Sequence, residues 1–511
     1  MILIVDFGSQ YIQFIARRIR ESKVYCEVYP FHKITEQLIE EFSPRGIILS
    51  GGPASVNDEN APKIPDWIFN LRVPILGICY GFQYMAHFFG GIVKKSDNRE
   101  YGKAHLINIE DCILLNGACD FGCNQIWMSH GDVMTLCPKD FKIAGWSNRH
   151  PAVIINEKRK LYALQFHPEV AHTQDGVKIL NNFIYKICGC LSDWTMRSFQ
   201  DDAIAKIQNQ VGDGSVISAI SGGVDSSVSS TLIHKAIGNQ ITCVFVDNGL
   251  TRLGEVEQVE KSLRSLGMKL IIKDASDLFL KRLKGVVDPE KKRKVIGVTF
   301  IEVFKTVADG IGGAKFLGQG TLYPDVIESV TVFGGGTAPI KSHHNVGGLP
   351  AHMDMELVEP LRMLFKDEVR ILGKELGIPD DILGRWPFPG PGLAIRIFSQ
   401  EVTPYKLELC RKADAIFTQE VRKAGLYNKI WQGFAGIPPG RTVGVMGDER
   451  TYDYTFALRA VISTDGMTAD AFEFPQGFIN SVVTKIINEV PGLNRGYYDY
   501  TSKPPGTIEW E

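Results

Sequence analysis

The 511-residue sequence lacks any uninterrupted apolar stretch long enough to span a bilayer. It also lacks the basic segment that opens a secretory signal peptide, and its first six residues read instead as a β-strand. Neither sign of charge is in excess, because 56 Lys and Arg oppose 58 Asp and Glu, for a net charge of −2. This balance gives no global attraction to nucleic acid or to an anionic membrane, and we expect neither as a partner.

Cysteine is sparse and irregularly spaced, with ten residues in the whole chain. That usage excludes a disulfide scaffold and predicts reduced thiols in the cytoplasm. Cys188 and Cys190 form a C-x-C pair, but no second pair matches it, so we interpret them as ordinary thiols rather than a metal site. The length predicts about three domains.

The loop at 221–227 is rich in Gly and Ser but does not end in the Gly-Lys-Ser/Thr of a Walker motif. An apolar run at 216–220 predicts a buried strand before it, and 228–237 predicts a helix after it. Small residues between a strand and a helix N-terminus are typical of a phosphate cradle, and Asp225 is a candidate ligand for Mg²⁺. The residues of the cradle are Ser221, Gly222, Gly223, Val224, Asp225, Ser226 and Ser227.

Asp247 directly follows a further apolar strand at 241–246. We expect it at the same sheet edge as the cradle, where it is a candidate contact for a nucleotide or a metal ion. The alternative is a plain turn, which Asp-Asn-Gly also favours.

The first 190 residues alternate strands with helices, which predicts a mostly parallel sheet covered by helices. Three motifs follow strand ends, at 50–53, 77–81 and 166–169, and strand carboxyl ends are where ligands bind in such sheets. The expected strands are Leu3–Asp6, Gly46–Leu49, Pro74–Cys79, Ala152–Asn156 and Leu161–Gln165, and the expected helices are Gln10–Arg20 and Phe82–Phe89.

The second motif, Gly-x-Cys-x-Gly, has the form of a nucleophile elbow that presents Cys79. His167 is a candidate proton acceptor and donor, with Glu169 holding its tautomer. The backbone N–H groups of Gly52 and Tyr80 are candidates for an oxyanion hole. The alternative for each motif alone is a structural one. A buried cysteine usually serves only as a small apolar side chain, and the tripeptide His-Pro-Glu occurs by chance in many sequences.

Together the three motifs resemble the class I, triad-type glutamine amidotransferases. The resemblance implies that Cys79, His167 and Glu169 hydrolyse glutamine to glutamate and ammonia through a thioester. It also implies that glutamine is held by Gln83, Ser129, His130, Gly131 and Asp132. A rival triad built on His130 and Asp132 ranks second, because their segment does not follow a strand end.

The cradle resembles the PP-loop of ATP pyrophosphatases, which cleave ATP between its α and β phosphates. Several chemistries share this loop, and downstream segments at 318–325, 340–350, 359–362 and 366–370 narrow the choice. Lys341 and Lys366 are plausible phosphate partners, although solvated lysines are the alternative. His343 and His344 lack further ligands at metal spacing, so we do not expect a metal site there.

As a set, these segments resemble the glutamine-hydrolysing GMP synthetase family over the whole chain. The resemblance implies that Lys366 and the cradle bind ATP with Mg²⁺, and that the C2 oxygen of xanthosine monophosphate (XMP) is adenylated before ammonia displaces AMP. It implies that Arg293 binds the XMP phosphate, with a solvated basic run as the alternative. Lys503, Ile508 and Glu509 are the other implied XMP contacts.

The expected fold is α/β, with two parallel-sheet domains followed by a smaller α+β domain. The expected domains are 1–190 (amidotransferase), 191–386 (ATP pyrophosphatase) and 387–511 (XMP binding and homodimerisation). A Pro/Gly-dense stretch from Trp386 to Ala394 predicts a rigid linker. Two alternatives are a glutamine-dependent NAD synthetase, which usually carries a different glutaminase, and a regulatory protein that has kept the fold without turnover.

Overall fold

The computed structural model describes residues 1–107, 109–118, 124–147, 149–329, 355–463, 466 and 468–511. These residues fall into two compact units. Of the described residues, the first unit contains Met1–Phe199 and 324–329, and the second contains Gln200–Tyr323, 355–463, 466 and 468–511. The predicted domain boundaries at 190 and 386 remain predictions.

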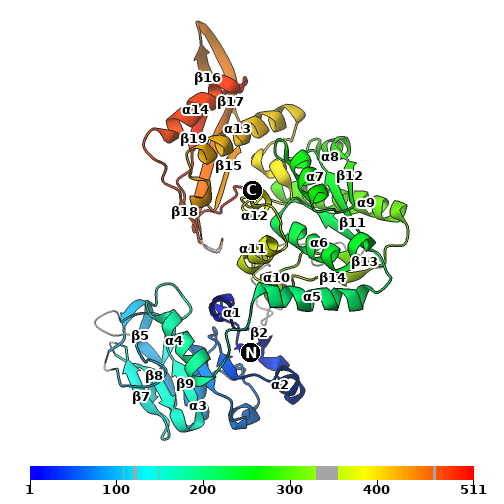
Figure 1. Cartoon of the computed structure of the whole chain (residues 1–511). Helices are drawn as coiled ribbons and strands as arrows, with labels where there is room; N and C mark the ends of the chain where they lie inside the picture. Colours follow the sequence, from blue (N-terminus) through cyan, green and yellow to red (C-terminus); the bar gives the residue numbers. More distant parts are fainter. Residues whose placement is uncertain (108, 119–123, 148, 330–354, 464–465, 467) are drawn as a thin grey trace. The chain divides into compact units, whose positions relative to one another are not determined.

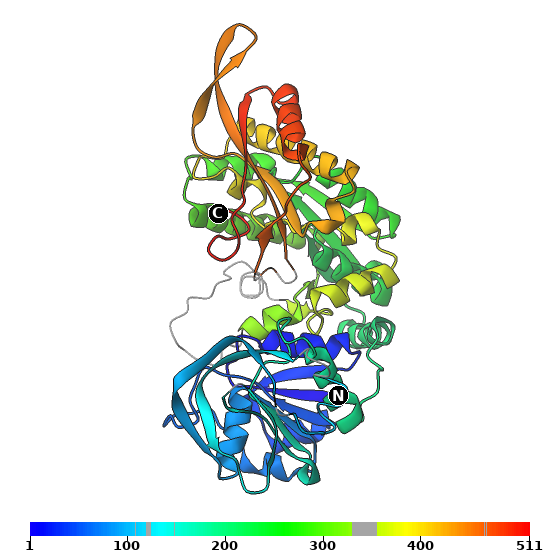
Figure 2. The same cartoon turned by 90° about the vertical axis from the view of Figure 1, so that its left-hand side faces the viewer.

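The first unit is built on a seven-stranded sheet in the order β2-β1-β3-β4-β9-β8-β7. Strands β2 to β9 of this order are parallel, and β8 and β7 continue the sheet antiparallel. A separate antiparallel pair, β5·β6, completes the unit (Figure 2). The strands are β1 (Ile2–Asp6), β2 (Cys26–Pro30), β3 (Gly46–Leu49), β4 (Ile75–Ile78), β5 (Ile92–His105), β6 (Gln125–Leu136), β7 (Lys142–Trp146), β8 (Pro151–Asn156) and β9 (Leu161–Leu164).

Helices cover this sheet at the positions that the apolar spacing predicts. Ile12, Ile15 and Ile19 are buried at helical spacing on α1, while Arg17 and Arg18 are only half-buried. The helices are α1 (Ile12–Glu21), α2 (Glu36–Phe42), α3 (Tyr80–Phe88) and α4 (Gly176–Asn181). The five expected strands and two expected helices are confirmed to within two residues at either end.

The second unit begins within helix α5 and contains a parallel five-stranded sheet in the order β12-β11-β10-β13-β14 (Figure 1). Its strands are β10 (Val216–Ile220), β11 (Ile241–Asp247), β12 (Leu270–Asp274), β13 (Phe316–Gly318) and β14 (Glu356–Val358). Its helices are α5 (Met196–Val211), α6 (Val224–Ile237), α7 (Glu255–Ser265), α8 (Ser276–Leu283), α9 (Pro289–Ile311), α11 (Lys366–Glu375) and α12 (Asp380–Leu383). Helix α10 (Tyr323–Ser329) lies almost wholly in the first unit.

A mixed sheet follows in the same unit, with β15 and β16 antiparallel to β17, and β19 parallel to it. The hairpin of β16 and β17 projects from the rest of the unit (Figure 1). The remaining elements are α13 (Pro404–Lys423), β15 (Gln432–Gly436), β16 (Arg441–Met446), β17 (Glu449–Ile462), β18 (Asp470–Ala471), α14 (Phe478–Glu489) and β19 (Leu493–Tyr498).

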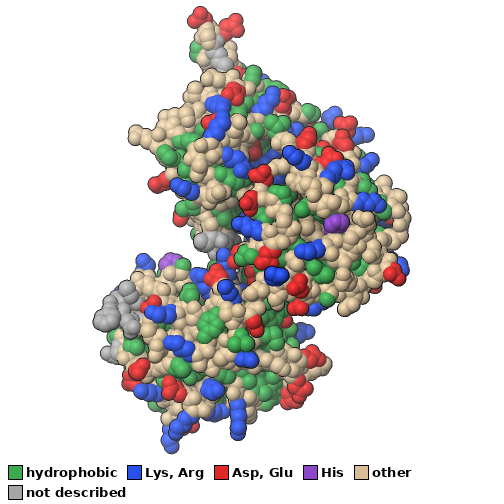
Figure 3. Space-filling view, viewed as in Figure 1, with side chains coloured by type: hydrophobic (Ala, Val, Ile, Leu, Met, Phe, Trp, Pro, Cys, Tyr) green, Lys and Arg blue, Asp and Glu red, His purple; other side chains and the backbone are tan. Residues whose placement is uncertain are grey.

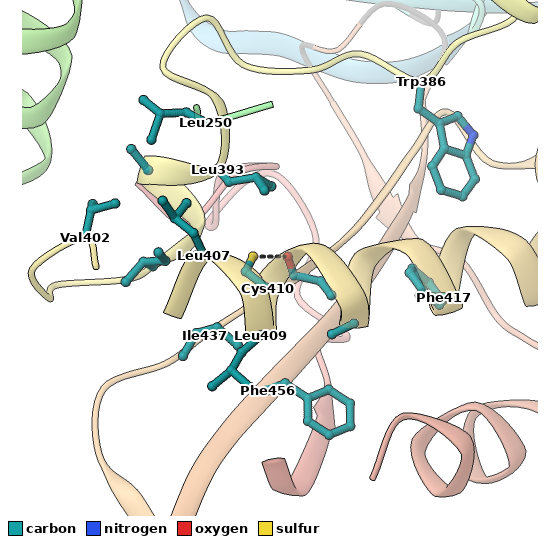
Figure 4. Packing of buried hydrophobic residues seen from close by; sticks show 14 of the residues in the cluster. Leu250, Trp386, Leu393, Val402, Leu407, Leu409, Cys410, Phe417, Ile437 and Phe456 are labelled. Atoms are coloured by element: carbon teal, nitrogen blue, oxygen red, sulfur yellow. Dashed lines mark hydrogen bonds between the residues drawn. The ribbon is translucent and has the colours of Figure 1, made fainter. Parts of the chain in front are cut away.

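One hydrophobic core runs through both sheets of the second unit. Figure 4 shows part of it around α13, where the Cys410 thiol donates to the carbonyl of Ala435 at 3.5 Å. Because buried residues of the parallel sheet, such as Val244, belong to the same cluster as Phe456 of β17, the two sheets are packed as one body.

The stretch Trp386–Ala394, predicted to be a rigid linker, is anchored in the core at both ends. The indole of Trp386 is buried, stacks on Tyr427 at 4.2 Å and donates from Nε1 to the carbonyls of Tyr427 and Ile430. The short helix Gly392–Arg396 that follows is wholly buried. Residues 387–391 between these anchors are half-buried or exposed, whereas Trp386, Leu393 and Ala394 belong to the core cluster.

Within the described residues, no helix has the length and apolarity needed to cross a membrane. The eight cysteines that the structure describes are free thiols. On the face drawn in Figure 3, basic and acidic side chains are interspersed over both units. This mixture agrees with the small net charge of the sequence.

Candidate active sites

Cys79 sits at a strained turn between β4 and α3, as the elbow motif predicts. It has φ 53° and ψ −99°, which is an uncommon conformation for a residue with a side chain. The flanking glycines are required by packing, since a Cβ on Gly77 would lie 2.5 Å from the carbonyl oxygen of Gly81. The turn therefore presents the thiol at the carboxyl edge of the sheet, at the N-terminus of α3.

His167 and Glu169 follow β9, the neighbour of β4, and form a buried pair. Nδ1 of His167 lies 2.7 Å from Oε1 of Glu169, and the Thr173 hydroxyl donates to the His167 carbonyl at 2.6 Å. Burial opposes the charged imidazolium, but the Glu169 carboxylate and the Cys79 sulfur outweigh it and raise the pKa of His167 well above its ordinary value. The pair is thus suited to hold a proton beside the thiol.

A pocket of about 510 Å³ opens over these groups. Most of the predicted glutaminase residues line it, and Gln83 reaches across it to donate to the Asp132 carbonyl at 2.9 Å. The predicted residues in its wall are Gly52, Cys79, Gln83, Ser129, His130, Gly131, Asp132 and His167. Glu169 lies behind His167, and the ring of Tyr80 is buried with its hydroxyl on the Pro62 carbonyl, so only its main chain is left for the oxyanion role.

The rival pair does not have the geometry of a triad. His130 Nδ1 lies 3.0 Å from the main-chain oxygen of Asp132, and its Nε2 lies 3.3 Å from Glu100. The Asp132 carboxylate instead accepts from the Ser55 hydroxyl. His130 therefore acts as part of the pocket wall, because its carboxylate partner is Glu100 and not Asp132.

Sequence reasoning missed several residues of the pocket, among them Tyr11, Lys95, Arg99 and Tyr101. Tyr11 packs edge-on against His167 at 4.9 Å. Lys95, Arg99 and Tyr101 lie on β5, whose pairing with β6 brings them to the pocket over a long sequence distance. No local motif marks these positions.

Exchanging Glu169 for Gln should slow glutamine hydrolysis by up to about 10⁴-fold. It should also move the upper limb of the pH–rate profile to lower pH. The pKa of His167 is raised in the folded protein, so its imidazolium persists as pH rises; removal of the Glu169 charge lowers that pKa and the imidazolium is lost earlier. Glutamate release across a pH series measures this, with exposed Glu157→Gln as the control. Superimposable profiles for Glu169→Gln and the unchanged protein would contradict the assigned pair.

The phosphate cradle lies between β10 and α6, and its last four residues form the first turn of the helix. Gly222 has φ +77°, and the Ser221 hydroxyl accepts from the Gly223 N–H at 3.3 Å. Asp225 Oδ2 lies 3.3 Å from the Lys366 ammonium. Its Oδ1 is buried and has no hydrogen-bond partner among the described residues, which fits a carboxylate oxygen open to a cation.

Arg385 contacts the cradle, and the sequence analysis did not predict this role. Its Nη1 donates to the carbonyl of Gly222 at 2.9 Å and lies 3.3 Å from Glu255, while Nη2 donates to Gln258. Asp247 ends β11 beside β10, at the same edge as the cradle, as predicted. Its Oδ1 accepts from the Gly249 N–H at 2.9 Å, so it also makes the turn that its sequence favours.

The four predicted XMP contacts all lie in the second unit and already have protein partners. Arg293 Nη2 donates to the main-chain oxygen of Glu511 at 2.5 Å, and Lys503 Nζ donates to the Gly466 carbonyl at 2.7 Å. Glu509 pairs with Arg396 at 3.0 Å, and Ile508 is buried beside Val461 and Ala469. Lys341, His343 and His344 lie outside the described residues.

Comparisons with known proteins decide the family. The family model of class-I glutamine amidotransferases matches residues 3–187, and the model of the GMP synthase C-terminal domain matches residues 419–510. The glutamine-hydrolysing GMP synthase of Bradyrhizobium sp. (strain ORS 278) is 58% identical over 100% of this chain and 96% of its own length. That of Phenylobacterium zucineum (strain HLK1) is 57% identical over 100% of this chain and 98% of its own length.

The chain belongs to the glutamine-hydrolysing GMP synthase family. Among solved structures, a GMP synthase subunit from Thermoplasma acidophilum, described as putative, is 32% identical with a TM-score of 0.34, covering 37% of this chain and 93% of its own. The expected class I amidotransferase fold and the family resemblance are confirmed. Membership of the GMP synthase family excludes the alternative of an NAD synthetase.

Proposed function

We propose that the two units divide glutamine-dependent GMP synthesis between them, with Cys79 producing ammonia and the cradle at Ser221–Ser227 activating XMP. As a GMP synthase the chain is a ligase of purine biosynthesis that uses ATP and glutamine. The observation that carries the division of roles is the pocket in which Cys79 and His167 meet Gly52 and Gln83.

In the first unit, the Cys79 sulfur attacks the carboxamide carbon of glutamine while His167 carries the thiol proton. The N–H groups of Gly52 and Tyr80 hold the oxyanion, and His167 returns the proton to the departing ammonia. A water molecule, deprotonated by His167, then hydrolyses the thioester and releases glutamate. Glu169 keeps Nδ1 of His167 hydrogen-bonded, so that the other ring nitrogen faces the reaction.

In the second unit, the C2 oxygen of XMP attacks the α-phosphorus of ATP, and pyrophosphate leaves. Ammonia then adds at C2, AMP departs with the oxygen, and GMP remains. The backbone N–H groups of Gly222 and Gly223, the serine hydroxyls of the cradle and Lys366 bind the pyrophosphate portion. Asp247, at the neighbouring strand end, contacts the rest of the nucleotide.

The carboxylate of Asp225 fits Mg²⁺, because its Oδ1 is buried without a protein partner among the described residues and hard cations prefer such oxygens. When bound, Mg²⁺ supplies charge stabilisation for the departing pyrophosphate. Without it, Lys366 is the cation closest to this carboxylate among the contacts that the structure describes.

Arg293, Lys503, Ile508 and Glu509 hold XMP in this proposal. The guanidinium of Arg293 matches the geometry of a phosphate, and Arg293 lies near the N-terminal, positive end of α9. Because Glu509 is already fixed by Arg396 and Gln432, it presents an oriented carboxylate to the base.

We also infer a homodimer formed through residues 387–511, and a cytoplasmic location. The projecting β16·β17 hairpin exposes Val443, Val445 and Tyr452, which favours burial against a second copy. The free cysteines favour a reducing compartment. We expect the intact chain to sediment at twice the monomer mass, and the double replacement of Val445 and Tyr452 by Ser to give a monomer. An unchanged chain that sediments as a monomer would contradict the dimer.

The assay of the function combines XMP, ATP and Mg²⁺ with either glutamine or an ammonium salt. We expect GMP and pyrophosphate in equal amounts from both nitrogen sources. Chelation of Mg²⁺ should stop both products. Absence of GMP with either source would contradict the proposal.

A further inference from the structure

Buried cations of the second unit converge on residues 499–511, called the C-terminal tail below. The described residues bury four Lys and Arg side chains, at Arg20, Lys292, Arg396 and Arg459. The last three all contact the tail. Buried charge is costly unless it is paired, so this concentration ties the tail to the interior by more than apolar packing.

Two of these cations hold the middle of the tail. Arg459 donates to the carbonyls of Thr501, Thr507 and Ile508 at 2.8–3.0 Å. Arg396 pairs with Glu509 at 3.0 Å. These contacts fix the backbone around the residues assigned to XMP.

Lys292 holds the last residue of the tail. Its side chain is fully buried, and Nζ donates to the carbonyls of Ala394 and Ile397 at 3.1 and 2.7 Å and to Oε2 of Glu511 at 3.0 Å. An ammonium group has three donors, so all of them are used. Lys292 thus joins the first turn of α9, the buried short helix that follows Trp386, and the tail.

Glu511, the partner of Lys292, is also fixed by several hydrogen bonds. Its Oε1 accepts from the Ser399 N–H, and its carboxylate side chain is only 5% exposed. Its main-chain oxygen accepts from Nη2 of Arg293 at 2.5 Å. Since Lys292 and Arg293 are consecutive, one residue of the tail contacts both the buried cation and the cation assigned to the XMP phosphate.

We propose that Lys292 and Glu511 form a latch that positions the tail and the Arg293 guanidinium for binding the XMP phosphate. The inference rests on the nucleotide site proposed above and deepens it. A guanidinium has five N–H donors, so the bond to Glu511 orients Arg293 and still leaves donors for phosphate. Lys292 is a positioning residue, because it is buried and acts through Glu511.

The electrostatics agree with this role. Burial lowers the pKa of the Lys292 ammonium, and the Glu511 carboxylate opposes that shift. Loss of the carboxylate would leave a buried cation with only two carbonyl partners, so tail docking depends on this pair. Trp510, between Glu509 and Glu511, stacks on Phe398 at 4.6 Å and completes the attachment.

The test uses the intact enzyme with ammonium as nitrogen source, so that the glutaminase does not contribute. Lys292→Met should raise the KM for XMP about tenfold, with the KM for ATP changed less than about twofold. Glu511→Gln, which keeps the shape but removes the charge, should give a smaller rise in the same direction. Lys291→Met, an exposed lysine of the same helix turn, is the matched control and should match the unchanged enzyme.

Hydrogen exchange of the tail supplies a second readout. We expect faster exchange of residues 499–511 in Lys292→Met without XMP, and partial recovery of protection at saturating XMP. If Lys292→Met does not fold, Glu511→Gln carries the same two measurements. Unchanged XMP KM and unchanged exchange in the folded latch variants would overturn the latch.

Arg293→Ala separates failure of the latch from failure of the site. A raised KM for XMP in Arg293→Ala, with no effect of the latch variants, would overturn the latch alone. An unchanged KM for XMP in Arg293→Ala would overturn the nucleotide site and the latch with it.

Discussion

Cys79→Ala should abolish GMP synthesis from glutamine and leave synthesis from ammonium intact. The thiol is the nucleophile that the elbow presents, and its loss leaves a pocket that still binds glutamine but forms no thioester. We expect the glutamine-driven rate to fall by about 10⁴-fold or more, since loss of the nucleophile of a triad removes most of its catalysis. The residues that we assign to XMP activation all lie in the second unit, so we expect that step to be unaffected.

The measurement compares GMP formed from the two nitrogen sources by the same preparation. Cys137→Ala is the matched control, because Cys137 is a half-buried free thiol of the same unit outside the pocket. Glutamine-driven synthesis that survives in Cys79→Ala would contradict the assigned nucleophile. Loss of both activities in a folded variant would contradict the separation of the two sites.

Asp225→Asn should abolish GMP synthesis from either nitrogen source. The change keeps the shape of the side chain but removes the negative charge from the oxygen that we assign to Mg²⁺. It also removes the charge partner of Lys366, which lies 3.3 Å away. Adenylation should fall by about 10²- to 10³-fold, as expected when a charge-stabilising group at a phosphoryl-transfer site is lost.

Pyrophosphate release measured with XMP and ammonium reports this step directly. Asp202→Asn, an exposed aspartate on α5 of the same unit, is the control and should release pyrophosphate normally. Normal release by Asp225→Asn would show that the carboxylate is not needed at the cradle.

Strand-end chemistry could be predicted from the sequence because it depends on short-range patterns. Apolar runs marked β3, β4, β9 and β10, and parallel pairing brings their carboxyl ends to one edge within each sheet. The motifs that follow those runs, at Cys79 and His167 above all, therefore meet without further information. The loop at Ser221–Ser227 was recognised for the same reason, although Val224 already belongs to α6.

Long-range burial was not predictable in this way. Pro and Gly around Trp386 indicated a linker, yet the indole fills the core through contacts with Tyr427, which is 41 residues away. The basic run at 291–294 gave no sign that Lys292 is buried on Glu511, and Arg385 carries no motif that links it to Gly222. Each of these depends on which distant segments pack together, and one sequence does not contain that information.

Oxygen transfer during the reaction tests the account most directly. XMP labelled with ¹⁸O at C2 is converted to GMP with ATP and ammonium, and the label is followed by mass spectrometry. If the C2 oxygen attacks the α-phosphorus of ATP, the label must appear in the phosphate of AMP, with none in pyrophosphate. Label found in water or in pyrophosphate, with unlabelled AMP, would contradict activation of XMP by adenylation.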